Sequence, residues 1–323
     1  MKPQTMTRQG KTFLIGTAAA CILAASCQKD EDEHSTGAGE VSTGKHHGGG
    51  SAQAAPPSPL ADLRQAIQAD RPMYELLEES HRLTQNLTPG QLAEIFAFMD
   101  GEPPEGMTDG VWRLLTNEIM EALRLNPLPE LGGELYGLAS SPRANPVVRD
   151  YAMQHYILCE EKVMRGGQDA AARTESLNRM LDNVGKLHSG TDTYTETLYG
   201  TSVLGLAAIA ESDAAAGADS IRERMAGWIT PWLDDSHEVS TANRIAAIQV
   251  AGRLKVEEAA DLVAATVWDK SAPLLERISA LYALNSFPAH MDEERLKKLA
   301  KEDRRLRHAT LALLDKHSSP QGR

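Results

Sequence analysis

Four stretches of this chain repeat one pattern of residue types, and the pattern restricts the fold more than any other feature. Each has an arginine, a small residue three positions on, a large apolar residue directly after it, and an apolar residue seven positions after the arginine. This spacing predicts one buried helix face, on which the small residue lets a neighbouring helix approach closely. We expect the arginine to reach a carbonyl or carboxylate of the adjacent helix pair. The four copies start at Arg149, Arg244, Arg277 and Arg307.

The composition of residues 58–323 favours helix over strand. This region contains 35 Leu against 21 Val and Ile together. Side chains branched at Cβ lose rotamer freedom in a helical turn, so their low share favours helices. No run of alternating apolar and polar residues bounded by hairpin turns is present. The sequence therefore predicts an all-α fold.

Starts and stops of helices are frequent. Thr88-Pro89-Gly90-Gln91 has the sequence of a capping box with proline at the first helical position, and Thr108 and Asn145 are further candidate N-caps. These marks divide residues 58–323 into about fourteen helical segments of roughly 10–20 residues. The predicted helix ends lie at Asn126-Pro127, Pro231 and Pro288.

The spacing of the copies indicates a repeat architecture. Arg277 follows Arg244 by 33 residues, and Arg307 follows after another 30. Helix pairs with a period of 30–50 residues are typical of an α-solenoid. The segments Asn145–Arg149 and Pro273–Leu284 resemble the second helix of HEAT or armadillo-like repeats. We assign 141–323 to HEAT-like repeats and 58–140 to an N-terminal helical region; an irregular helical bundle is the alternative.

The N-terminus has the features of an export signal. Lys2, Arg8 and Lys11 precede a short apolar run, Phe13–Ala25. About 20 apolar residues are needed to span a bilayer, so the run predicts a signal peptide over residues 1–26. Leu23-Ala24-Ala25-Ser26-Cys27 resembles the lipobox of bacterial lipoproteins, although Ala24 stands where that family prefers Leu. The resemblance implies that Cys27 carries acyl chains such as palmitate; an unmodified thiol beside a plain signal peptide is the alternative.

Residues 27–57 are predicted to be a lipidated, flexible tether. From Gln28 to Pro57 there is no aromatic residue, and Val41 is the single large aliphatic. A flexible coil of this length spans about 30 Å. His34, His46 and His47 could capture a metal, but a hydrophilic spacer explains them better. Lys29-Asp30-Glu31 resembles the export signal of surface-exposed lipoproteins of the Bacteroidetes type, or is a solvated spacer. We expect a bacterial envelope protein of the outer membrane.

Signatures of chemistry are absent from the sequence. It has no G-x-S-x-G, Walker A, G-x-G-x-x-G after a strand, or H-E-x-x-H motif. With three cysteines a four-cysteine zinc site cannot form, and a formal net charge of −12 argues against nucleic-acid binding. We predict no cofactor and no metal.

Two local groups have both a functional and a packing interpretation. His155 and Cys159 share a helix face, as a nucleophile and its base would, but Cys159 also continues an apolar stripe. Trp228 and Trp232 could form a stacking platform or close a helix end. The paired acids Glu78-Glu79, Asp234-Asp235 and Glu257-Glu258 are interpreted as solvated faces.

The strongest local charge lies near the C-terminus. From Arg295 to His308 there are seven basic and two acidic residues. This surface could dock an acidic partner, or it could be the polar face of a capping helix. We predict a non-enzymatic, lipid-anchored scaffold that binds an envelope protein; an envelope enzyme or a small-ligand carrier built from scattered helices is the alternative. The candidate interaction residues are Lys297, Lys298, Lys301, Arg304, Arg305 and Arg307.

Overall fold

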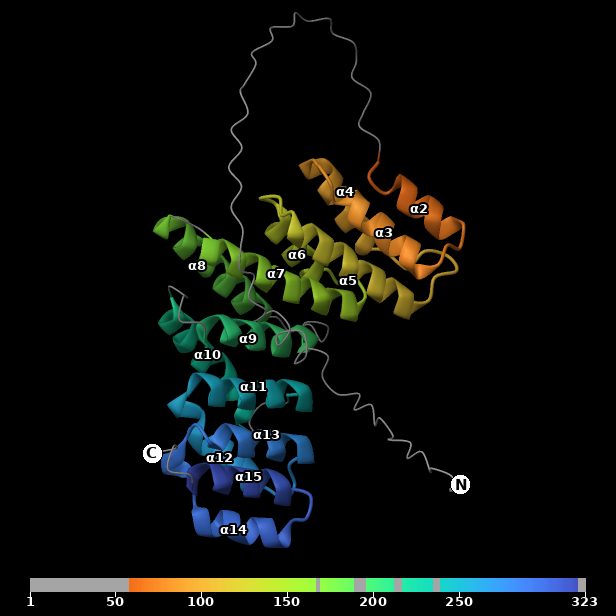
Figure 1. Cartoon of the computed structure of the whole chain (residues 1–323). Coiled ribbons are helices and arrows are strands. Elements are labelled where there is room, and N and C mark those ends of the chain that lie inside the picture. The colour runs from red at the N-terminus through yellow and green to blue at the C-terminus, as the bar shows by residue number, and fades with distance from the viewer. Residues whose placement is uncertain (1–57, 167–168, 189–195, 212–216, 235–238, 319–323) are drawn as a thin grey trace, which may run out of the picture. The chain divides into compact units, whose positions relative to one another are not determined.

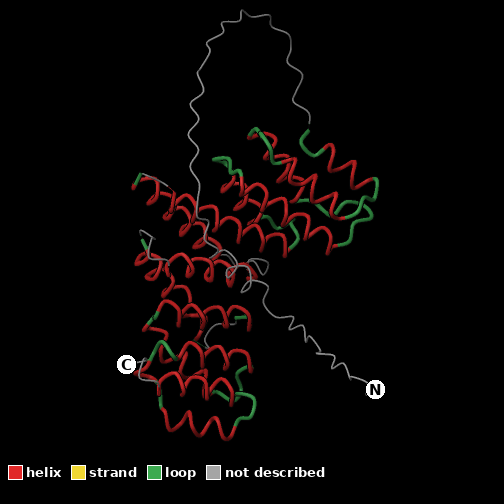
Figure 2. Tube along the Cα trace, viewed as in Figure 1, coloured by secondary structure: helices red, strands yellow, loops and turns green. Residues whose placement is uncertain are grey.

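The computed structural model describes residues 58–166, 169–188, 196–211, 217–234 and 239–318, here called the described residues. Within them every regular element is helical (Figures 1 and 2), as the sequence predicts. The elements are α2 (Ala61–Gln68), α3 (Met73–Leu83), α4 (Pro89–Met99), α5 (Asp109–Leu125), α6 (Leu131–Ser140), α7 (Pro146–Gly166), α8 (Ala170–His188), α9 (Glu196–Glu211), α10 (Ala218–Leu233), α11 (Thr241–Leu254), η1 (Glu257–Ala259), α12 (Ala260–Trp268), α13 (Leu274–Leu284), η2 (Pro288–His290), α14 (Glu293–Glu302) and α15 (Arg307–Ser318).

The predicted helix starts are confirmed at atomic detail. Thr88 accepts a hydrogen bond from the backbone N–H of Gln91, whose side chain accepts from the N–H of Thr88, so α4 begins with a complete capping box. The hydroxyl of Thr108 accepts from Val111 at the start of α5. Asn145 Oδ1 accepts from the N–H of Val147 at 2.9 Å, directly before α7. Local side-chain chemistry therefore fixes three of the helix starts.

The predicted stop at Pro231 is wrong. Pro231 lies inside α10, which continues to Leu233. A proline in a helix removes one backbone hydrogen bond, but only two helical residues follow it here. Those residues, Trp232 and Leu233, are both buried, and their burial holds the last part of the turn in the helix. The stops at Asn126 and Pro288 are confirmed, since α5 ends at Leu125 and Pro288 opens η2 after α13 has ended.

The odd-numbered helices pack in sequence order within residues 56–323, which form one compact unit. Each odd-numbered helix from α3 to α13 contacts the next odd-numbered helix, so that α7, α9, α11, α13 and α15 follow one another (Figure 1). The even-numbered helix before several of them packs against its odd partner, as in α6–α7, α12–α13 and α14–α15. The predicted division at residues 140/141 falls between α6 and α7.

The repeated pattern marks a buried face of α7, α11, α13 and α15. Its small residues, Ala152, Ala247, Ala280 and Thr310, are all fully buried. The large apolar residue after them is also fully buried in the first three copies, but Leu311 in α15 is 42% exposed. Small side chains thus stand where neighbouring helices meet, as the spacing predicts.

Candidate interaction surface

Arginines of the repeated pattern form hydrogen bonds to the helix that precedes their own. Arg149 in α7 donates from Nε to the carbonyl of Ala139 at 2.9 Å, and Arg277 in α13 donates from Nε to the carbonyl of Val267 at 3.2 Å. Both carbonyls lie ten residues before the arginine, on the penultimate residue of the preceding helix. Two repeat copies thus make the same contact, within their own helix pair rather than to the adjacent pair.

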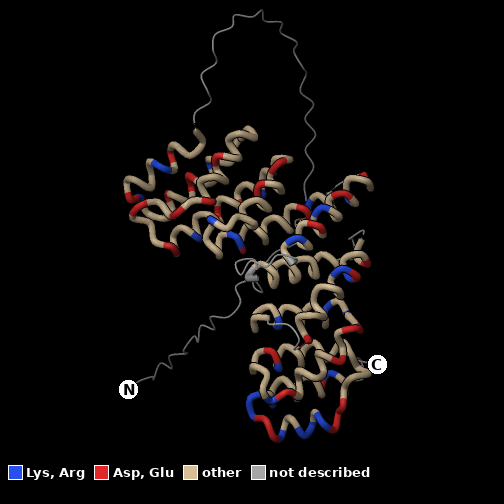
Figure 3. The backbone as a smooth tube through the Cα atoms, turned by 180° about the vertical axis from the view of Figure 1, so that it is seen from behind, with Lys and Arg blue, Asp and Glu red and all other residues tan. Residues whose placement is uncertain are grey.

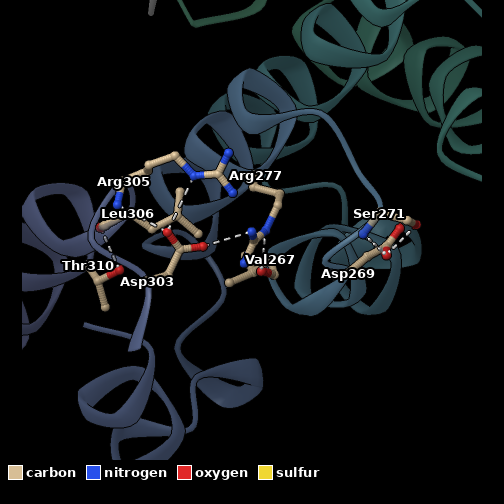
Figure 4. Close-up of polar contacts among 8 residues, drawn as sticks. All are labelled: Val267, Asp269, Ser271, Arg277, Asp303, Arg305, Leu306 and Thr310. Carbon is tan, nitrogen blue, oxygen red and sulfur yellow. Dashed lines mark hydrogen bonds and ion pairs between the residues drawn. The ribbon is translucent and has the colours of Figure 1, made fainter. Parts of the chain in front are cut away.

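Two arginines of the pattern also contact carboxylates of the next helix pair. Arg277 Nη1 donates to Asp303 Oδ2 at 3.0 Å, in the turn before α15 (Figure 4). Arg244 Nε lies 3.8 Å from Glu276 Oε2 at the start of α13. The predicted contact with the adjacent helix pair is therefore confirmed at Arg244 and Arg277, whereas the hydrogen bond from Arg149 to Ala139 lies within its own pair. Arg307 is exposed and makes no hydrogen bond or ion pair within the described residues.

The candidate interaction residues lie on α14, in the turn after it, and at the start of α15. Lys297 pairs with Glu293 and Glu294 at 2.8 and 2.9 Å, Lys298 lies 3.8 Å from Glu302, and Arg305 lies 3.8 Å from Asp303. Three of the six candidate residues thus pair with Asp303 or with acids of α14. Lys301, Arg304 and Arg307 make no such pair within the described part of the chain.

The basic character of this surface is weaker than its sequence window suggests. The window starts at Arg295, directly after Asp292, Glu293 and Glu294. Asp292 caps α14 by accepting from Arg295 N–H, and the two glutamates occupy the first helical turn. Acidic residues are favoured there by the helix dipole. Figure 3 shows acidic residues at both ends of α14 and basic residues between them. Arg304, Arg307 and Lys301 therefore form the unneutralised part of the surface.

His155 is buried in the interface of α5 and α7. Its Nε2 lies 3.2 Å from Asn117 Oδ1, and its Nδ1 lies 3.7 Å from Glu121 Oε2. Burial lowers the pKa of His155 to about 4, against the opposing effect of Glu121. The imidazole is therefore neutral near pH 7.

Cys159 is 8% exposed, and its thiol is free. Burial, reinforced by Glu160, raises the pKa of this thiol. A nucleophilic cysteine needs the opposite shift, so the packing interpretation of the pair with His155 is favoured. The described residues contain no group of three or more His, Cys, Asp or Glu side chains arranged to hold a metal ion.

Trp228 and Trp232 both pack against neighbouring helices. The ring of Trp232 stacks on Tyr199 of α9, with centroids 5.6 Å apart and planes at 25°. Trp228 lies against Gly185 of α8, where an added Cβ would stand 3.5 Å from its Cζ2. These contacts support the helix-end interpretation.

Of the paired acids, Glu78 and Glu79 both pair with Arg82, Glu257 and Glu258 are exposed, and Asp235 lies outside the described residues.

A groove of about 780 Å³ was not predicted from the sequence. Its lining comes from four places: the end of α5, the loop and first turn leading into α6, the C-terminal half of α7, and α8. No local motif could indicate it, because these segments lie far apart in the chain. At its edge Glu160 is buried, and Arg179 binds this carboxylate through Nε and Nη2 at 3.2 and 2.9 Å.

Gly132 gives the first turn of α6 its close approach to Glu160. A Cβ on Gly132 would stand 2.9 Å from Glu160 Oε1. Ser176 of α8 donates a hydrogen bond to the other oxygen of the same carboxylate. The Glu160 carboxylate therefore joins α7 to α8 and packs against the start of α6.

Comparisons with known proteins leave the family of the chain open. No family model, curated protein or solved structure matches it. Cys27, the predicted signal peptide and the predicted tether lie outside the described residues. Among the helices that the structure describes, none is long and apolar enough to cross a membrane.

Proposed function

We propose that this chain is a lipid-anchored protein of the bacterial envelope whose helical part is a non-enzymatic α-solenoid scaffold for protein–protein interaction. The observation that carries the proposal is the ordered packing of odd-numbered helices, each against the next, from α3 to α15 (Figure 1). In a solenoid each repeat contacts mainly its neighbours, and the stacked helices leave a long surface for partners.

Contacts between successive odd-numbered helices support the repeat interpretation. A Cβ on Gly252 of α11 would stand 2.8 Å from the Cα and Cβ atoms of Ala283 in α13, so these two helices touch at their backbones. The ion pair of Arg277 with Asp303 then connects α13 to the turn before α15. The resemblance of α7 and α13 to the second helix of HEAT repeats agrees with these contacts.

Exposed apolar side chains on α13 and α15 favour a binding role. Leu275 and Tyr282, seven residues apart on α13, are each 61% exposed, and Leu311 on α15 is 42% exposed. A seven-residue spacing places two side chains on the same helix face. Exposed apolar residues bordered by charge are common where proteins bind one another.

The N-terminal residues supply the membrane attachment in this proposal. Acylation of Cys27 would fix the chain to the outer membrane, and the tether would hold the helices about 30 Å away. Replacing Cys27 with Ala should abolish incorporation of a clickable palmitate analogue and release the protein from the membrane fraction. Continued labelling of that variant would contradict the anchor.

The scaffold proposal is tested by crosslinking in living cells. One variant changes Lys301, Arg304 and Arg307 to Glu, because these residues make no ion pair within the described part of the chain. A control variant of equal charge change replaces the exposed lysines Lys186, Lys255 and Lys270 with Glu. An envelope protein captured by wild type and control but lost from the first variant supports docking through the C-terminal surface. Capture by all three places the contact elsewhere on the helices, and no capture by any of them contradicts the scaffold.

A further inference from the structure

We propose that the groove between the α5–α6 loop, α7 and α8 binds a small amphipathic acid, an aliphatic group that ends in a carboxylate. The groove lies apart from the C-terminal surface and plays no part in the scaffold proposal. Its volume of about 780 Å³ is within the usual range for small-ligand sites. The ligand class is inferred from the wall and from the charged side chains of the groove.

One wall of the groove is apolar and stiff. It is formed by Pro127, Leu128 and Pro129, and Val163 of α7 adds a side chain that is 44% exposed. Two prolines fix their own backbone angles, so this wall needs little ordering when a ligand arrives. Gly133 also lines the groove, and a Cβ on it would meet no atom within 4 Å, which leaves open space beside the first turn of α6. An aliphatic group fits this wall.

Three basic side chains line the same groove. Arg124 is held by Glu121 through Nε and Nη2, at 3.2 and 2.6 Å, and Arg179 is held by Glu160 through the same two atoms. A guanidinium has five N–H donors, so each arginine keeps donors on its other edge, already oriented. Lys162 is exposed and makes no ion pair within the described residues.

Arg124, Lys162 and Arg179 line the groove together with Cys159. Burial and Glu160 raise the pKa of the Cys159 thiol, whereas Lys162, Arg124 and Arg179 each act to lower it. Beside Cys159 the three cations therefore meet two carboxylates, Glu121 on Arg124 and Glu160 on Arg179. The acids Glu130 and Glu134 line the groove at the start of α6. A ligand carboxylate is favoured beside Lys162, with its aliphatic part along the proline wall.

The binding test uses three probes with the same eight-carbon skeleton. Octanoate, octanamide and octylammonium are titrated by calorimetry into the full chain carrying Cys21→Ser and Cys27→Ser. Octanoate should bind at least about tenfold more tightly than octanamide, the ratio expected for one charge-assisted contact. Equal binding of octanoate and octanamide, or tighter binding of octylammonium, would overturn the proposal.

Cys159 reports where the probe binds, since it is the one thiol left in that chain. Saturating octanoate should slow its reaction with methyl methanethiosulfonate severalfold, and octylammonium at the same concentration should not. Octanoate binding without protection of Cys159 would place the ligand elsewhere and overturn the assignment to this groove.

Two pairs of variants separate the groove from general effects. Lys162→Glu should weaken octanoate binding by about tenfold or more, while Lys270→Glu, an equal charge change at another exposed lysine, should leave it unchanged. Gly133→Leu should fill the groove and abolish binding. Gly137→Leu, one turn along α6 and equally open, is its control. Unchanged binding in Lys162→Glu, or equal losses in both glycine variants, would contradict the site.

Discussion

Arg277 and Asp303 form an ion pair that connects α13 to the turn before α15. Their atoms Nη1 and Oδ2 are 3.0 Å apart, and the side chains are 3% and 17% exposed. The same guanidinium donates from Nε to the carbonyl of Val267 at the end of α12 (Figure 4). One buried side chain thus fixes α13 relative to the helix before it and to the helix pair after it.

Removing this guanidinium should be costly. Arg277→Met should lower the free energy of unfolding by about 3 kcal/mol, because the Asp303 carboxylate and the Val267 carbonyl both lose their partner. Urea denaturation followed by circular dichroism measures the change. Arg305→Met is the control, since that side chain is 68% exposed and should change stability by less than about 0.5 kcal/mol. Equal losses in the two variants would show that Arg277 has no special role.

The pH dependence of stability should reflect Asp303. Partial burial raises the pKa of this carboxyl, but the Arg305 N–H and the Arg277 guanidinium outweigh it and lower the pKa below the usual value. A depressed folded-state pKa adds stability above the unfolded pKa of about 3.9 and loses it as the pH falls further. Asp303→Asn should therefore destabilise at pH 7 and flatten the stability curve below about pH 4. Parallel curves for wild type and variant would contradict this linkage.

Local chemistry made much of the fold predictable. The capping box at Thr88 and the N-cap at Thr108 depend on residues three positions apart, and the buried faces depend on helical spacing. Pro231 was misjudged because the burial of Trp232 and Leu233, which keeps α10 helical, is a tertiary effect. The solenoid interpretation, the lipid anchor and the scaffold role stay predictions.

The charge of the C-terminal surface and the groove beside α7 were harder to predict. A window beginning at Arg295 leaves out the acids of the first turn of α14, which pair with Lys297. The groove escaped prediction because Arg124, Lys162 and Arg179 come from three different helices. Such a site exists only once the helices have packed, so no spacing in the sequence indicates it.

His155 should make the free energy of unfolding depend on pH in a higher range than Asp303 does. Burial lowers its pKa from 6.5 to about 4, so the unfolded chain binds a proton between these values and the folded chain does not. Stability should be complete above about pH 6.5 and fall by up to about 3 kcal/mol as the pH drops to 4. His155→Gln should remove this slope while keeping an amide to contact Asn117. The measurement is urea denaturation of both proteins at several pH values, and identical slopes would refute the assignment.

Alanine substitutions at two glycines should change the free energy of unfolding in opposite directions, because only one of them lies where α11 meets α13. Gly252→Ala should destabilise by about 1–3 kcal/mol, because its Cβ would stand 2.8 Å from Ala283 Cα and the two backbones must separate. Gly227→Ala in α10 should instead stabilise by up to about 1 kcal/mol, since its Cβ meets nothing within 4 Å and alanine favours helix. Thermal or urea unfolding of both variants decides the matter. Stabilisation by Gly252→Ala would mean that the helices do not meet at this glycine, and the repeat packing drawn from it would be wrong.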